Sequence, residues 1–149
     1  MGRSTKWREM AMAMVNIEEL KRLHAFLSTR WPNGLPHNQC NRTAYIVQKL
    51  LGGLVAGGWP RDDRTGLKIN RGFCDSTGKW RFHYWNVIGN YIVDLTAGQF
   101  EDDSIIFTDK NDPRYCAIVT GLPDDLKDFE STRTSIAAEW LAEYVSLTR

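Results

Sequence analysis

Three side chains of this sequence could together carry nucleophilic catalysis, and they occur in the order Cys40, His83 and Asp94. A cysteine thiolate attacks carbonyl carbon readily when a neighbouring base accepts its proton. A histidine can be that base, and a carboxylate bonded to one ring nitrogen leaves the other nitrogen available. The combination predicts acyl chemistry on an amide or a related carbonyl group, provided that the fold brings the three groups together.

The histidine and the aspartate belong to a predicted β-hairpin. A Gly-Asn pair separates two β-prone runs, 79–88 and 91–95, and such a two-residue loop favours a turn of the primed type. Because the turn fixes the register, His83 and Asp94 are expected to be diagonal neighbours, with Cβ atoms about 7 Å apart. The alternative is a purely structural hydrogen bond within the sheet. The expected face of the hairpin presents His83, Trp85, Val87, Ile92, Asp94 and Thr96.

The candidate nucleophile, Cys40, begins a predicted helix that Gly52 and Gly53 end. A helix N-terminus offers unpaired N–H groups and a positive dipole end, and both favour the thiolate. The N–H of Cys40 could stabilise an oxyanion, with a second donor from the loop before it. A small core cysteine is the alternative for this position. The sequence leaves the second donor open among His37, Asn38 and Gln39.

Three further polar or aromatic residues lie close to these positions in the sequence. Trp85 could wall the substrate cleft, and Asn86 or Gln99 could contribute polar contacts to a substrate. Each also has a plain structural interpretation, which is packing for Trp85 and a hydrogen bond at a strand end for the other two.

Composition narrows the classes of function. The chain has 149 residues and a formal net charge of +1, which predicts one domain and gives no indication of nucleic-acid binding. Its apolar stretches fall short of the roughly 18–20 residues that span a bilayer, so no membrane association is expected. The cysteines Cys40, Cys74 and Cys116 are odd in number and widely spaced, which indicates reduced thiols in a cytoplasmic protein.

A metal site is the second alternative for the reactive residues. Cys40, His83 and either Asp94 or Cys116 could supply ligands, but the sequence has no close spacing such as CxxC or HExxH. We therefore expect no metal and no cofactor.

The elements that must position these residues are predicted from periodicity and turn residues. Residues 1–16 are expected to be a flexible leader, followed by a single domain over 17–149. Helices are predicted over 17–30, 40–51 and 131–147, and strands over 54–59, 67–74, 79–88 and 91–95, with a short strand at 105–107 in an otherwise loop-rich stretch, 97–115. Helices at both ends around hairpin-connected strands indicate an α+β domain.

The motifs also carry a resemblance. Cys40 opening a helix, then His83-Tyr-Trp-Asn86, then Asp94-Leu-Thr96, resembles the core of transglutaminase-like proteins in residue type and order. More closely, the stretch from Cys40 to Phe100 is similar to the YunG-like family of small bacterial and phage proteins. The resemblance implies a papain-like fold, in which the cysteine helix packs on an antiparallel sheet carrying the histidine and the aspartate.

Two functions follow from these observations. The first is a cysteine hydrolase or transferase of the protease, amidase or deamidase type, acting on a protein, a peptide or a small-molecule amide that the sequence does not identify. The second is a non-catalytic binding or inhibitor protein on the same fold, in which the three residues are only buried polar structure.

Overall fold

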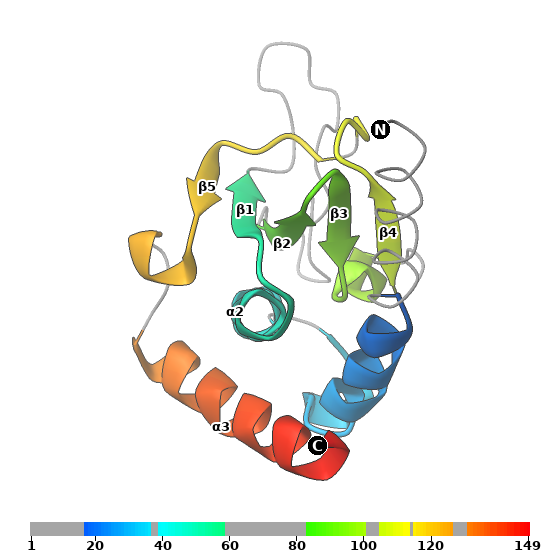
Figure 1. Ribbon diagram of the computed structural model, residues 1–149, viewed down its shortest axis with the longest axis vertical. Helices are drawn as coiled ribbons and strands as arrows, with labels where there is room; N and C mark the ends of the chain where they lie inside the picture. Colours follow the sequence, from blue (N-terminus) through cyan, green and yellow to red (C-terminus); the bar gives the residue numbers. More distant parts are fainter. Residues whose placement is uncertain (1–16, 37–38, 59–82, 101–104, 114, 127–130) are drawn as a thin grey trace, which may run out of the picture.

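The computed structural model describes residues 17–36, 39–58, 83–100, 105–113, 115–126 and 131–149, which form an α+β fold (Figure 1). The described helices are an N-terminal helix (residues 17–28), α2 (Cys40–Leu51) and α3 (Ser131–Thr148), with 3₁₀ turns η1 (Pro32–Gly34), η2 (Ala97–Phe100) and η3 (Pro123–Asp125). The described strands are β1 (Leu54–Gly58), β2 (His83–Ile88), β3 (Tyr91–Asp94), β4 (Ile106–Asp109) and β5 (Val119–Gly121).

The five strands form one antiparallel sheet in the order β4-β3-β2-β1-β5. The chain passes from the β4 edge to the opposite β5 edge along one end of the sheet, as the yellow connection in Figure 1 shows. This crossover places residues of the β4–β5 connection at the ends of the central strands. Strands β2 and β3, which hold the candidate histidine and aspartate, are interior strands of the sheet.

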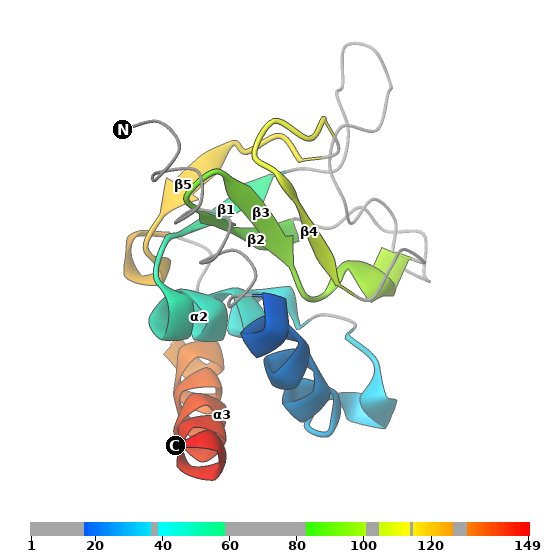
Figure 2. The same ribbon diagram turned by 45° about the vertical axis from the view of Figure 1, so that its right-hand side comes forward.

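The described helices lie together on one side of the sheet, and α2 is the helix placed against the strands (Figures 1 and 2). Leucines of the N-terminal helix, aliphatic residues of α2 and the buried face of α3 share one core with β3. Its buried members are Leu20, Leu23, Leu27, Trp31, Ile46, Val47, Val93, Leu95, Ala137 and Tyr144. The apolar stripe at helical spacing that defines the N-terminal helix in the sequence is therefore the stripe that the core buries.

The hairpin has the predicted register, with Val87 opposite Ile92 and Ile88 opposite Tyr91. Gly89 has a positive φ of 58° and Asn90 does not, which is the pattern of a type II′ turn with glycine at its first central position. Each strand alternates its side chains between the two faces of the sheet, so this register decides which residues meet.

A glycine also sets the distance between α2 and the hairpin. Gly53, between α2 and β1, has a φ of 78°, and a Cβ added there would collide with the backbone carbonyl oxygen of Val87. Only glycine fits this close approach without moving the backbone. The sharp turn after Leu51 therefore returns the chain directly from the helix into the sheet.

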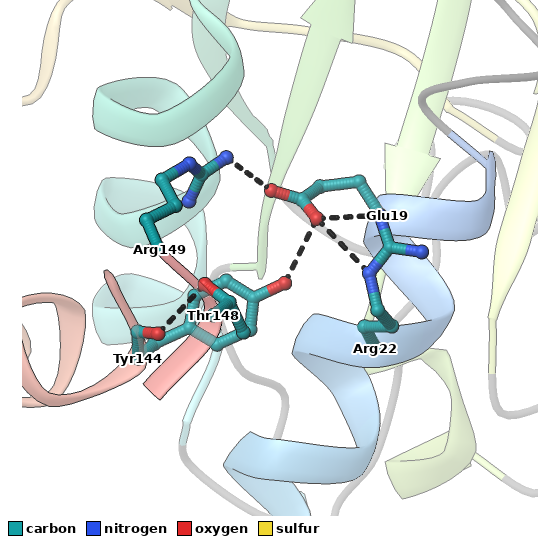
Figure 3. A network of polar contacts seen from close by, with 5 residues as sticks. All are labelled: Glu19, Arg22, Tyr144, Thr148 and Arg149. Carbon is teal, nitrogen blue, oxygen red and sulfur yellow. Dashed lines mark hydrogen bonds and ion pairs between the residues drawn. The ribbon is translucent and has the colours of Figure 1, made fainter. Parts of the chain in front are cut away.

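A polar cluster joins the first and last described helices (Figure 3). The Glu19 carboxylate accepts hydrogen bonds from Arg22, from the Tyr144 hydroxyl at 3.0 Å and from Arg149 at 2.7 Å. We call these four residues the Glu19 cluster. The cluster joins residues 130 positions apart and so links the N-terminal helix to the end of α3.

Several boundaries differ from the sequence predictions. The N-terminal helix ends at residue 28, where 29–30 form a turn, and the predicted short strand at 105–107 is β4, Ile106–Asp109. Strand β5 was not predicted, because its three residues, Val119–Gly121, are too few to show an alternating pattern. The predictions for 1–16 and 67–74, and for 79–82 of the third predicted strand, lie outside the described residues. Among the residues that the structure describes, every helix is too short or too polar to cross a lipid bilayer.

Candidate active site

Cys40 is the first residue of α2, as predicted, and Gln39 occupies the N-cap position. The thiol donates a hydrogen bond to the Asn41 side-chain oxygen over 3.4 Å. Cys40 packs in a small buried cluster that includes Val55 of β1 and Tyr84 of β2. The packing of this first turn against the central strands places the sulfur at the end of β2 where the candidate histidine lies.

The His83 ring lies between the thiol and a carboxylate. Its Nε2 is 2.8 Å from Asp94 Oδ2, and because a carboxylate only accepts hydrogen bonds, Nε2 carries the proton. The ring also forms a hydrogen bond with the side chain of Cys40, which leaves Nδ1 as the nitrogen for that contact. The cross-strand partner of His83 in β1 is Gly58, so no side chain lies directly opposite His83 on that strand.

Asp94 accepts hydrogen bonds through both of its oxygens. Oδ1 accepts from the backbone N–H of Thr96 at 3.0 Å and from its hydroxyl at 3.2 Å. Oδ2 accepts from His83 and from the Tyr115 hydroxyl, each at 2.8 Å. We call Cys40, His83, Asp94, Thr96 and Tyr115 the Asp94 cluster. Donors on both oxygens leave the carboxylate little freedom to rotate, so its direction toward the imidazole is fixed.

The charges of His83 and Asp94 stabilise one another inside the protein. Burial alone would lower the pKa of His83, but the charge of Asp94, the hydrogen bond to it and the contact with Cys40 together raise it to about 9. Burial alone would raise the pKa of Asp94, but the charge of His83 and the hydrogen bonds from His83, Tyr115 and Thr96 lower it. The pair is therefore an imidazolium and a carboxylate at neutral pH.

A buried amide connects the two elements that carry the thiol and the imidazole. Asn86 Nδ2 of β2 donates to the backbone carbonyl oxygen of Ala44 in α2 at 2.9 Å. Asn86 is fully enclosed, so this bond replaces water that neither group can reach. It is a mid-strand link that holds the cysteine helix against the histidine strand, and not the strand-end contact considered from the sequence.

The remaining predicted site residues are placed as follows. Trp85 is buried and packs edge-on against Tyr115, and its ring centroid is 5.9 Å from that of His83, so its surroundings are those of a packing residue. The backbone N–H of Gln39 donates to Pro36, and its side-chain oxygen accepts from Arg42 at 3.4 Å. Asn38 and His37 lie outside the described residues. Gln99 lies in η2, but its side chain is outside the described part of the structure.

Tyr115 was not predicted from the sequence. It follows β4 in the connection that leads to β5, a stretch with neither helical nor strand periodicity, and no motif marks it. Its neighbour Cys116 is exposed, whereas Cys40 is buried, and Cys74 lies outside the described residues. Across the described ranges, no group of three or more His, Cys, Asp or Glu side chains is arranged to bind a metal ion.

Comparison with known families supports part of the resemblance seen in the sequence. The family model described as YunG protein matches residues 22–138, a range that contains Cys40, His83, Asp94 and Tyr115. Neither a curated protein nor a solved structure matches the chain. The match covers well over half of the sequence, and the chain therefore belongs to the YunG family.

Proposed function

We propose that this protein is a cysteine-dependent acyl hydrolase or acyl transferase with a papain-like, transglutaminase-like arrangement of Cys40, His83 and Asp94. Its substrate is an amide or a related acyl group of a protein, a peptide or a small molecule. The observation that carries the proposal is that one imidazole bonds to a buried carboxylate and to a cysteine at the start of a helix. The cytoplasmic location expected from the sequence belongs to the same proposal, because the nucleophile must stay reduced.

In the acylation step, the thiolate of Cys40 attacks the carbonyl carbon and the C–S bond forms. The carbonyl π electrons move to oxygen, where the N–H groups of the first turn of α2 can stabilise the negative charge. The imidazolium of His83 then gives its proton to the leaving nitrogen, the C–N bond breaks, and a thioester remains on Cys40.

In the second step, neutral His83 accepts a proton from water or from an acceptor amine as that group attacks the thioester carbon. The C–S bond breaks, the electron pair returns to sulfur, and the thiolate–imidazolium pair forms again. Asp94 does not change its protonation state in this scheme. It holds the imidazole in the tautomer that directs Nδ1 to the sulfur and stabilises the positive charge.

The second candidate is the non-catalytic binding protein, and one observation favours it. Cys40 is 8% exposed and His83 and Asp94 are each 1% exposed, so the three groups are almost completely buried. A buried polar group of this kind can serve stability alone. Chemical reactivity of the thiol separates the two functions.

The test is the rate of Cys40 alkylation by iodoacetamide between pH 5 and 9, followed by peptide mass spectrometry. Exposed Cys116 is an internal reference on the same molecule. A thiolate–imidazolium pair keeps its thiolate where an ordinary thiol, with a pKa near 8.5, is almost fully protonated. We therefore expect Cys40 to react about tenfold or more faster than Cys116 at pH 6.

The same measurement in His83→Ala provides the control. Loss of the preference for Cys40 in a variant that keeps its circular dichroism spectrum would link the reactivity to the imidazole. If Cys40 reacts no faster than Cys116 at pH 6 in the wild type, the catalytic proposal is wrong and the binding protein is the better description.

A further inference from the structure

Tyr115 reaches the candidate site from an element that carries none of the three reactive residues. It is 7% exposed, its hydroxyl donates to Asp94 Oδ2 at 2.8 Å, and its ring centroid lies 5.2 Å from that of Trp85. The backbone N–H of Tyr115 donates to the carbonyl oxygen of Asp112, which fixes the turn from which the side chain extends. The tyrosine is thus held by backbone, ring and hydroxyl together.

The carboxylate oxygen that Tyr115 uses is the one that His83 uses. Both donors lie 2.8 Å from Oδ2, while Thr96 occupies Oδ1. Each donor offsets part of the negative charge on Oδ2, so the Tyr115 hydroxyl and the imidazole compete for the same oxygen. A residue in this position acts on the imidazole without touching it.

We propose that Tyr115 is a positioning residue of the site, which fixes Oδ2 of Asp94 and limits the negative charge that this oxygen presents to His83. The proposal rests on the proposed function. It adds to Cys40, His83 and Asp94 a fourth residue, which affects how readily His83 donates and accepts a proton in that reaction.

The reaction gives this adjustment a purpose. His83 must be an imidazolium to donate a proton to the leaving nitrogen, and must be neutral to accept one from water in the next step. If Oδ2 of Asp94 accepted only from His83, the carboxylate would hold the imidazolium too strongly and slow the second step at neutral pH. The Tyr115 hydroxyl offsets part of that attraction while keeping the carboxylate oriented.

The groups that face His83 can be named from each described element around it. They are the Cys40 thiol from α2, the Asp94 carboxylate from β3 and, through that carboxylate, the Tyr115 hydroxyl from the β4–β5 connection. Trp85 of β2 is uncharged, and Gly58 of β1 has no side chain. Within the described residues, Tyr115→Phe therefore changes one polar contact of the pair and leaves the charged groups in place.

The experiment is an NMR titration of the imidazole resonances in the wild type and in Tyr115→Phe. The chain has three histidines, so the His83 signal can be assigned with His24→Gln and His37→Gln variants. We expect the titration midpoint of His83 to move upward by about half a pH unit in Tyr115→Phe, because Asp94 then has one donor fewer on the shared oxygen. An unchanged or lower midpoint would overturn the role given to Tyr115.

Tyr144→Phe is the matched control. It removes an equivalent tyrosine hydroxyl from a different carboxylate, that of Glu19, so it should lower stability while leaving the His83 midpoint unchanged. Alkylation of Cys40 in the wild type keeps the two proposals separate. Slow alkylation would refute the proposed function, whereas preferential alkylation with an unmoved His83 titration would refute only the role of Tyr115.

Discussion

The Asp94 cluster and the Glu19 cluster are built on the same plan from different partners. Each is centred on a carboxylate that accepts hydrogen bonds through both oxygens, and each includes a tyrosine hydroxyl. The charged partners of Glu19 are two guanidinium groups, which stay charged at every ordinary pH. The charged partner of Asp94 is an imidazole that also touches a thiol.

The difference separates a carboxylate whose charged partners keep their charge from one whose charged partner can titrate. Hydrogen bonds from Arg22, Arg149 and Tyr144 outweigh burial and lower the pKa of Glu19, while burial and the contact with Glu19 raise the pKa of Tyr144. The Glu19 cluster therefore keeps its charges across the neutral range. The Asp94 cluster can lose its positive charge near pH 9.

The two clusters also differ in their place relative to the family match. Cys40, His83, Asp94 and Tyr115 all lie within the matched residues, 22–138. Glu19, Tyr144 and Arg149 lie outside it. The family model therefore spans the candidate chemistry and only one residue, Arg22, of the cluster that joins the helices.

The largest effect is expected from Asp94→Asn. The amide carries no negative charge to stabilise the imidazolium, so the pKa of His83 should fall well below about 9, because burial is then opposed only by the contact with Cys40. Cys40 should then be alkylated about tenfold or more slowly at pH 6 than in the wild type. Unchanged alkylation together with an unchanged His83 titration would show that the Asp94 cluster resembles the Glu19 cluster more than we propose.

A second prediction concerns stability against pH. The folded pKa of His83, about 9, is above the unfolded value of 6.5, so its contribution is complete below pH 6.5 and is lost as the pH rises through 9. A shift of this size corresponds to at most about 3 kcal/mol. Urea unfolding at pH 6.5 and 9.5 should show this loss in the wild type. The loss should be absent in Asp94→Asn, and an equal slope in both proteins would contradict the assignment.

The smallest effect is expected from Glu19→Gln. The substitution leaves two guanidinium groups without their carboxylate, but both are partly exposed and can bind water instead. The free energy of unfolding should fall by about 1–2 kcal/mol, because one amide oxygen cannot accept from Arg22, Arg149 and the buried Tyr144 hydroxyl together. Cys40 alkylation should not change. A loss of Cys40 reactivity in Glu19→Gln would show that the two clusters are coupled through the core.

Local patterns were sufficient to predict the His83–Asp94 contact of the candidate site. The Gly89 turn fixes the pairing of Val87 with Ile92, and the His83–Asp94 contact depends on that register alone. The position of α2 was equally local, because a short apolar repeat begins at Cys40 and glycines follow Leu51. That Cys40 meets His83 was a hypothesis taken from residue chemistry and resemblance, since no local rule joins a helix to a distant strand.

The parts that were missed depend on contacts distant in the sequence. Tyr115 reaches Asp94 only because the chain crosses the sheet from β4 to β5, and β5 is too short to have been predicted. The Glu19–Arg149 contact joins two helices whose relative packing no single-segment pattern encodes. Both are products of tertiary packing, which sequence periodicity does not specify.

The span of the Glu19 cluster has a consequence for how the chain folds as it is synthesised. His83 and Asp94 are 11 positions apart, so their hairpin can form while later residues are still being added. Glu19 and Arg149 are 130 positions apart, and their contact must wait until α3 has been made. Until then, Leu20, Leu23 and Leu27 of the N-terminal helix lack the α3 part of their core. A nascent chain would therefore form the hairpin of His83 and Asp94 first and cover its helical core last, which makes the late stage of synthesis the one most prone to aggregation.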